Sequence, residues 1–480
     1  MSPTDRSRKR RRVLRVVLSA AITVVMCVSY VIADILDVVP GLLTEQAVRM
    51  PRYASPAVAL KSGMVIGTVA RQRTIDAGAA GALIDQFAQS QGLGSDFSVV
   101  ITDDLGDVVG GRDQNAAREP ASTLKTLTAL AVSNVLDMGS TLATSVYLDQ
   151  TGEGAALTLS GSGDMLLGSG NSDSGHINGR AGLATLADGT AKALKQRGIS
   201  RISFNYDDSL FGTVRSPDHI SQNNQNDQFF APISSMAVDG GRQWNGVQPS
   251  DPDVFDSYPT LSTHTASDAA QRFISLLRAR GITVAGPAGS VSTGKTPSGL
   301  SPIASVHSAT LGEIMAFMLR HSDNTLAEEF GRLLALRMGT DNSPAGAVQA
   351  VQKELKTLGL DMGGLVMADC SGLSPGSQVT ATTLAQVQAH NLRAGKGAAA
   401  AEGLSIPGAL GTAVDRLDDA RAAGLMRVKT GSLDTVTAMA GNVSRLKGGT
   451  LAFAVIINKP QDMNAARSAI DTFIAKLVGL

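Results

Sequence analysis

Residues 119–125 read EPASTLK, and this stretch decides the fold prediction. Pro120 suits the start of a helix, and apolar side chains follow at helical spacing on one side as far as Val135. Ser122 opens this predicted amphipathic helix, so Lys125 lies one turn further on the same face. A serine hydroxyl becomes a good nucleophile only when a base takes its proton. A lysine whose pKa is depressed by burial can be that base. The stretch therefore predicts Ser122 as a nucleophile and Lys125 as its general base.

Two further short motifs follow in a fixed order. Ser322-Asp323-Asn324 interrupts two helical patterns, the first of which begins with a capping box at Thr310 and Glu313. We expect Ser322 to pass a proton towards a departing amine and Asn324 to hold a substrate amide.

The third motif comprises Lys429, Thr430 and Gly431, and it is predicted at the end of the first of three consecutive antiparallel strands. Lys429 would place a positive charge near the base, and with Thr430 it would grip a terminal carboxylate. Gly431 would allow close backbone approach. Ser432 and Ser122 are the candidate donors of two backbone N–H groups to an oxyanion. A substrate peptide could also pair along this strand.

Single motifs of this kind are unspecific, and Ser-x-x-Lys recurs at Ser292 with Lys295 and at Ser444 with Lys447. Neither copy opens a predicted helix. The set of three, in this order and context, resembles that of penicillin-binding proteins and class A β-lactamases.

From about residue 74 to its end, the chain resembles the D-alanyl-D-alanine carboxypeptidase/endopeptidase family of class C penicillin-binding proteins. A separation of 200 residues between Ser122 and Ser322 fits the extra domains that this family inserts there. Residues 161–167, 207–211, 232–237 and 369–374 resemble family stretches. Cys370 departs from the family pattern, which has glycine there, and so do the two residues that follow Ser374.

The resemblance implies an α+β fold: a penicillin-binding/β-lactamase-like catalytic domain with a five-stranded antiparallel sheet and a helical cluster. This domain would comprise residues 63–139 and 306–480, with an inserted α+β region at 140–305. The implied activity is a serine D-Ala-D-Ala carboxypeptidase, with endopeptidase activity open. It would act on peptidoglycan stem peptides through an acyl-enzyme on Ser122 and be inhibited by β-lactam antibiotics. The chemistry needs neither a cofactor nor a metal. Asp207 or Asp208 could reach the free end of the substrate's diamino acid.

The composition supports a folded protein and argues against a nucleic-acid partner. Hydrophobic residues make up 43% of the chain and charged residues 18%, while 42 basic residues balance 42 acidic ones. The two cysteines, Cys27 and Cys370, do not predict a disulfide, since Cys27 lies in an apolar segment.

The N-terminus predicts export from the cytoplasm. Seven cations between Arg6 and Arg15 precede the uncharged run 16–33. Cations remain on the cytoplasmic side of a membrane segment, so the rest of the chain would lie outside the cytoplasm. Residues 1–33 are thus predicted as a basic segment and a membrane anchor, with a cleaved signal peptide as the alternative. Residues 34–62 would be a stalk.

Some patterns in the sequence match other classes of protein. Residues 289–296 match a phosphate-loop pattern, but prolines follow where a helix must start. Residues 372–376 match a nucleophile elbow, but Pro375 lacks the N–H that the oxyanion would need. A β-lactamase would share the three motifs, yet the Glu-x-x-Leu-Asn segment that class A enzymes use for deacylation is absent. A catalytically weak module that binds peptidoglycan in the envelope also remains open.

Overall fold

The computed structural model describes residues 3–36, 74–152, 154–246, 248–255, 257–286, 291–393, 398–416 and 419–480. The chain divides into two compact units, residues 1–68 and 69–480, and each is described by itself. The predicted stalk at 34–62 lies almost entirely outside the described residues.

The first unit contains one long helix, α1 (Pro3–Ile35). Its segment Val13–Ile35 is long and apolar enough to cross a membrane, and an N-terminal signal sequence would meet the same criteria.

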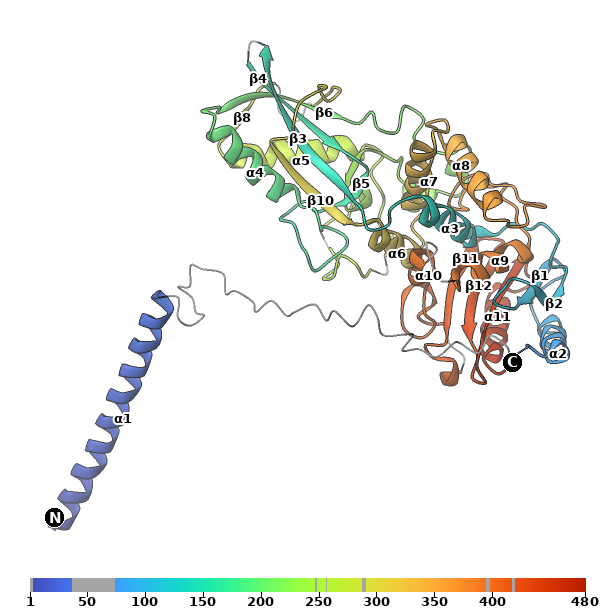
Figure 1. Cartoon of the computed structure of the whole chain (residues 1–480), viewed down its shortest axis with the longest axis horizontal. Helices are drawn as coiled ribbons and strands as arrows, with labels where there is room; N and C mark the ends of the chain where they lie inside the picture. Colours follow the sequence, from blue (N-terminus) through green and yellow to red (C-terminus); the bar gives the residue numbers. More distant parts are fainter. Residues whose placement is uncertain are drawn as a thin grey trace, which may run out of the picture. The chain divides into compact units, whose positions relative to one another are not determined.

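The second unit is built on a five-stranded antiparallel sheet with the strand order β11-β12-β13-β1-β2 (Figure 1). The strands are β1 (Phe97–Thr102), β2 (Val108–Arg112), β11 (Met426–Leu433), β12 (Val436–Ser444) and β13 (Thr450–Asn458). The sheet therefore joins a hairpin near residue 100 to the last three strands of the chain, which confirms the predicted sheet.

The two faces of this sheet carry side chains of different size, because successive residues of a strand point to opposite faces. Phe453, Val455 and Ile457 of β13 face α2 (Ala77–Ala88) and α11 (Met463–Leu477) in one core. Ala440 and Ala454 lie on the other face, in the core of the helical cluster. The small side chains let helices approach this second face closely.

The helical cluster contains α3 (Lys125–Val135), α6 (Leu311–His321), α7 (Asn324–Met338), α8 (Pro344–Thr357), α9 (Ala381–Asn391) and α10 (Ala398–Glu402). The predicted capping box is confirmed: the Thr310 hydroxyl accepts from the N–H of Glu313, whose carboxylate accepts from the N–H of Thr310.

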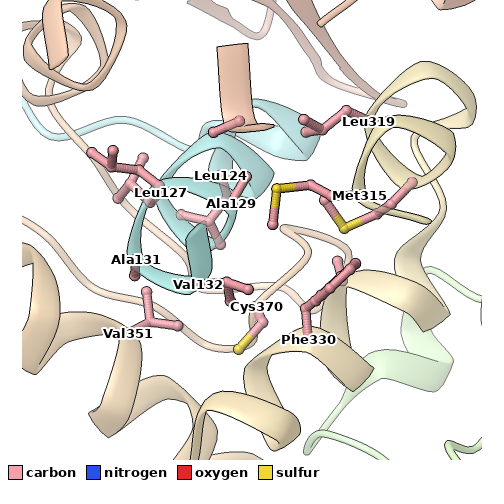
Figure 2. Packing of buried hydrophobic residues seen from close by; sticks show 14 of the residues in the cluster. Leu124, Leu127, Ala129, Ala131, Val132, Met315, Leu319, Phe330, Val351 and Cys370 are labelled. Carbon is pink, nitrogen blue, oxygen red and sulfur yellow. The ribbon is translucent and has the colours of Figure 1, made fainter. Parts of the chain in front are cut away.

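The helix that follows Ser122 differs from the amphipathic helix that the sequence predicts. Residues Ala121–Leu124 form a 3₁₀ turn, η1, and α3 begins only at Lys125. Every residue of α3 from 125 to 133 is buried, since other helices and the sheet surround it. Figure 2 shows this packing, with Phe330 and Cys370 on one side of α3 and Met315 and Leu319 on another. A helix that is enclosed on all sides has no solvent-exposed polar face, so its sequence pattern is not amphipathic.

Between α3 and α6 the chain forms the inserted α+β region. Its six-stranded sheet has the order β10-β3-β4-β6-β8, with β9 beside β6. The strands are β3 (Thr141–Gly152), β4 (Gly154–Gly161), β6 (Arg201–Asp207), β8 (Thr283–Val284), β9 (Ser292–Thr293) and β10 (Ala304–Thr310). Helices α4 (Leu183–Lys195) and α5 (Thr265–Ala279) pack on this sheet (Figure 1), and β5 (Asp164–Leu167) pairs with β7 (Met236–Val238).

The sheet of the inserted region crosses the predicted boundary at residue 305, because β10 pairs with β3 as far as Thr310. Part of the phosphate-loop match, 289–290, lies outside the described residues. Residues 294–303 contain no helix.

Candidate active site

The predicted nucleophile and base contact each other. Lys125 Nζ donates to Ser122 Oγ at 3.0 Å, to Asn324 Oδ1 at 2.6 Å and to the carbonyl oxygen of Ser371 at 2.9 Å. The lysine side chain is fully buried. Three hydrogen-bonding partners thus fix the position of the Lys125 nitrogen beside the serine.

Burial lowers the pKa of Lys125 to about 8, although the carboxylates of Asp369, Asp323 and Glu328 oppose this shift. Removing a cation from water disfavours its charged form. At neutral pH a useful fraction of this lysine is therefore neutral and able to accept a proton.

The second motif lies at the junction of two helices. Ser322 ends α6 in the left-handed conformation, with a φ of 56°, and Asp323 caps the N-terminus of α7 by accepting from Leu326 N. Asn324 is the first residue of α7, and its Nδ2 donates to the carbonyl oxygen of Phe229 in the inserted region. In this geometry Ser322 accepts a hydrogen bond from Lys429, and Asn324 accepts one from Lys125.

The third motif lies within β11, not at the end of a strand as the sequence predicts, because β11 continues to Leu433. Lys429 is opposite Ala440 and therefore points to the same face of the sheet. Its Nζ donates to Ser322 Oγ at 2.9 Å and to the carbonyl oxygen of Thr430 at 2.9 Å. Burial and the nearby charge of Lys125 lower the pKa of Lys429 well below its ordinary value.

A cavity of about 630 Å³ opens in front of these groups. Ser122, Ser322, Asn324, Thr430 and Ser432 all line it. The predicted site residues are thus brought together from η1, the α6–α7 junction and β11. The two lysines lie behind the cavity wall, buried. Such a cleft, with a few convergent polar groups, is the usual form of a small-ligand site.

Gly431 does not line the cavity, and the reason for a glycine here differs from the expected one. A β-carbon at this position would lie 2.7 Å from the carbonyl oxygen of Pro120 and 3.2 Å from Thr123 N. The close approach is therefore between β11 and the 3₁₀ turn that carries Ser122.

The sequence interpretation missed the role of the loop at 369–374. Asp369 is fully buried, and its carboxylate accepts from the backbone N–H groups of Ser371, Gly372, Leu373 and Ser374 and from the Ser371 hydroxyl. This fixes the Ser371 carbonyl oxygen that accepts from Lys125. An aspartate before small residues is a turn signal. Nothing near residue 369 in the sequence, however, indicates that this turn contacts Lys125. Ser374 is 1% exposed, so this loop presents no elbow nucleophile.

Four other residues without a motif also shape the site. Glu328 accepts from Cys370 N, and Thr412 Oγ1 lies 2.7 Å from Thr430 Oγ1. Asn458 exchanges two hydrogen bonds with the backbone of Glu119, just before the nucleophile turn. Arg242 of the inserted region pairs with Asp323.

Asp207 and Asp208, which could reach the free end of the substrate's diamino acid, do not line this cavity. Asp207 accepts from Ser209 and Thr296, and Asp208 accepts from Arg215 and Ser235. Both carboxylates hold together the inserted region.

Comparison with known protein families identifies the family of this chain. The model of the D-Ala-D-Ala carboxypeptidase 3 (S13) family matches residues 80–262 and 256–477. The chain belongs to this family. It is a serine-type D-Ala-D-Ala carboxypeptidase.

Individual relatives agree with the S13 assignment. Carboxypeptidase DacB of Mycolicibacterium smegmatis is 32% identical over 390 residues, 78% of this chain and 79% of the relative. A carboxypeptidase of Mycobacterium tuberculosis is 31% identical over 388 residues, again 78% and 79%. The crystal structure of penicillin binding protein 4 from Haemophilus influenzae superposes with a TM-score of 0.68 at 19% identity, over 85% of this chain and all of that one. This last likeness concerns the fold.

Proposed function

We propose that this S13 enzyme cleaves D-Ala-D-Ala ends of peptidoglycan stem peptides through an acyl-enzyme on Ser122, with Lys125 as the general base. The observation that carries the proposal is the fully buried Lys125 amino group, whose Nζ lies 3.0 Å from Ser122 Oγ and contacts two further acceptors. A base must lie within hydrogen-bonding distance of the proton that it removes.

The reaction follows from these positions. Lys125 takes the Ser122 proton as Oγ bonds to the carbonyl carbon of the penultimate D-Ala. The backbone N–H groups of Ser122 and Ser432 stabilise the oxyanion. Ser322, held by Lys429, passes a proton to the departing D-Ala amine. Water then hydrolyses the ester and regenerates the serine.

The substrate would lie along β11. This strand is at the edge of its sheet, and Ser405 already pairs with the outer side of Val428, so an extended peptide would pair further along the strand, near Ser432. Thr430, which lines the cavity, would hold the terminal carboxylate with the buried Lys429 behind it, and Asn324 would hold the peptide amide. Gly431 contributes by letting this strand approach the nucleophile turn.

β-Lactam antibiotics should acylate the same serine. The Haemophilus influenzae relative has also been crystallised with a β-lactam, and that structure superposes with a TM-score of 0.63. The large insertion and the family membership favour a carboxypeptidase over a β-lactamase. Endopeptidase activity on cross-linked peptides would use the same acylation step.

The catalytic unit would act outside the cytoplasm. Peptidoglycan lies there, and the basic, apolar N-terminus fits a membrane anchor with residues 1–33 as its cytoplasmic and spanning part. A cleaved signal peptide is the alternative.

Mass spectrometry of the detergent-solubilised full chain tests the proposal. Incubation with benzylpenicillin should add one penicilloyl group that maps to Ser122, and the Ser122→Ala variant should add none. A muropeptide pentapeptide should then lose its terminal D-Ala, while a cross-linked dimer measures endopeptidase activity. A folded protein without adduct or D-Ala release would instead be a peptidoglycan-binding module. Rapid penicillin hydrolysis without a lasting adduct would indicate a β-lactamase.

A further inference from the structure

The α6–α7 junction, which carries Ser322 and Asn324, needs external support. Ser322 adopts a left-handed conformation, which costs a non-glycine residue free energy unless its surroundings hold it there. Its hydroxyl must nevertheless meet Lys429 while the neighbouring Asn324 meets Lys125. A small rotation of this junction would separate both pairs.

Arg242, from the inserted region, provides a rigid contact to this junction. Its Nη2 donates to Asp323 Oδ2 at 2.7 Å, and its Nη1 donates to the carbonyl oxygen of Asp239 at 3.1 Å and to Asp239 Oδ1 at 3.2 Å. The side chains of Arg242 and Asp323 are only 7% and 9% exposed. Asp239 is itself held by Trp244 and Asn178.

Aromatic rings fix the plane of the guanidinium group. Arg242 Cζ lies 4.6 Å from the ring centre of Phe255 and 5.8 Å from that of Phe317, which belongs to α6. Phe255 also stacks on His321 at 4.4 Å, with an interplanar angle of 8°. The residues on both sides of Ser322 are therefore held by the inserted region.

We propose that Arg242 is a positioning residue for acylation: it fixes the Ser322–Asn324 junction and neutralises the Asp323 carboxylate, so the inserted region takes part in catalysis. This inference rests on the proposed function of Ser122 and Lys125. Arg242 also lines the cavity, and this proposal gives it a role in positioning the catalytic junction.

The charge of Arg242 has a measurable consequence at the base. Asp323, Asp369 and Glu328 all raise the pKa of Lys125, against the larger effect of burial. Lys429 is another titratable group near Lys125, and its own pKa is lowered by burial and, to a smaller extent, by the charge of Lys125. Phe255 contacts both Arg242 and His321, and burial, with a smaller contribution from the charge of Arg242, lowers the pKa of His321. Removing Arg242 leaves Asp323 uncompensated, so the pKa of Lys125 should rise and less neutral lysine should be present at pH 7.

The test uses the full-length enzyme and the second-order rate of acylation by nitrocefin between pH 6 and 9. Wild-type acylation of Ser122 is checked first, because its failure would contradict the proposed function and not this inference. Arg242→Met should lower the rate at pH 7 roughly ten- to a hundredfold, as expected when a buried charged partner is left unpaired. The acid limb of its pH–rate profile, where the acylation rate rises with pH, should also move to higher pH.

Two further variants separate positioning from general damage. In Asp323→Asn the uncompensated charge is gone, so adding Arg242→Met to this background should not move the acid limb further. Arg242→Lys should keep the limb but lower the plateau rate, since an ammonium group cannot hold Asp323 and Asp239 in the same plane. If Arg242→Met does not fold, the plateau acylation rate of Arg242→Lys tests the proposal.

A matched control is available in the same region. Arg280 pairs with Asp188 at 2.7 Å and joins α5 to α4, away from the cavity lining. Arg280→Met should leave rate and pH profile unchanged. The inference is overturned if a folded Arg242→Met or Arg242→Lys acylates at the wild-type rate, if Arg280→Met has the same effect, or if the limb shift persists without the Asp323 charge.

Discussion

Gly431 of β11 packs directly against Pro120, the residue that begins the nucleophile turn. A β-carbon on Gly431 would lie 2.7 Å from the Pro120 carbonyl oxygen, a distance that forces one of the two backbones to move. The strand predicted to bind substrate and the turn that carries Ser122 are therefore positioned by one contact.

Gly431→Ala should consequently lower the acylation rate at least tenfold and destabilise the fold by about 1–3 kcal/mol, the usual cost of overpacking. Gly81→Ala is the matched control, because nothing lies within 4 Å of its added β-carbon and Gly81 belongs to α2. This control should be neutral or slightly stabilising. Nitrocefin kinetics and thermal unfolding measure both effects. Wild-type acylation by Gly431→Ala would show that the two backbones separate without consequence.

The pH dependence of acylation should report Lys125. The free enzyme needs the neutral amine, and the pKa of Lys125 is lowered to about 8. The rate constant should therefore rise about tenfold per pH unit below this value and level off above it. Lys125→Arg should be acylated at a severely reduced rate at every pH, since a guanidinium does not lose its proton. Stopped-flow nitrocefin kinetics give the profile, and a flat profile between pH 6 and 9 would contradict the lysine-base scheme.

Asp369→Asn should weaken the loop that holds the Ser371 carbonyl oxygen. Asp369 Oδ1 accepts from Ser371 N and Gly372 N, and Oδ2 accepts from Leu373 N and Ser374 N. Either orientation of an asparagine amide turns an NH₂ group towards N–H donors, so a loss of about 2–3 kcal/mol in unfolding free energy is expected.

Asp361→Asn is the control for this change. Asp361 is exposed, and its Oδ1 accepts from Gly363 N alone among the described contacts. An asparagine oxygen can replace that acceptor, so urea unfolding should give a stability close to that of the wild type. Equal stability of both variants would argue against a structural role for the Asp369 carboxylate.

A buried carboxyl pair should make stability fall as pH rises. Burial raises the pKa of Asp164 to about 7 and that of Glu329 well above its usual value, with Asp164 adding to the shift of Glu329. Asp164 Oδ2 and Glu329 Oε1 accept no hydrogen bond within the described residues. The folded state thus holds a proton that the unfolded chain releases near pH 4.

The Asp164 contribution is therefore complete below about pH 4 and is lost as pH approaches about 7. Asp164→Asn removes this titration, so the variant should gain stability relative to the wild type across that window. Urea unfolding at several pH values measures the difference. A difference that stays constant from pH 4 to pH 8 would contradict the prediction.

Much of the local structure was predictable because its cause lies within a few residues. The capping box at Thr310 starts α6, and apolar runs produce β11, β12 and β13. The three motifs were recognised for the same reason, since each is a short stretch whose spacing is visible in the chain.

Other features depend on contacts that no local pattern records. The enclosed α3, the mid-strand place of Lys429, and the pairing of Asp207 with Thr296 all follow from packing between distant segments. Even the reason for Gly431 lies in a turn more than 300 residues earlier.

The residues that can supply a nucleophile, a base and a proton relay are recognisable from the amino-acid sequence, because side-chain chemistry and helix or strand periodicity are local properties. The contacts of Lys125 with the carbonyl oxygen of Ser371 and of Arg242 with Asp323 arise from the three-dimensional fold. Such partners are chosen by the folded geometry, since a buried charge is stable only beside groups that burial brings into hydrogen-bonding distance.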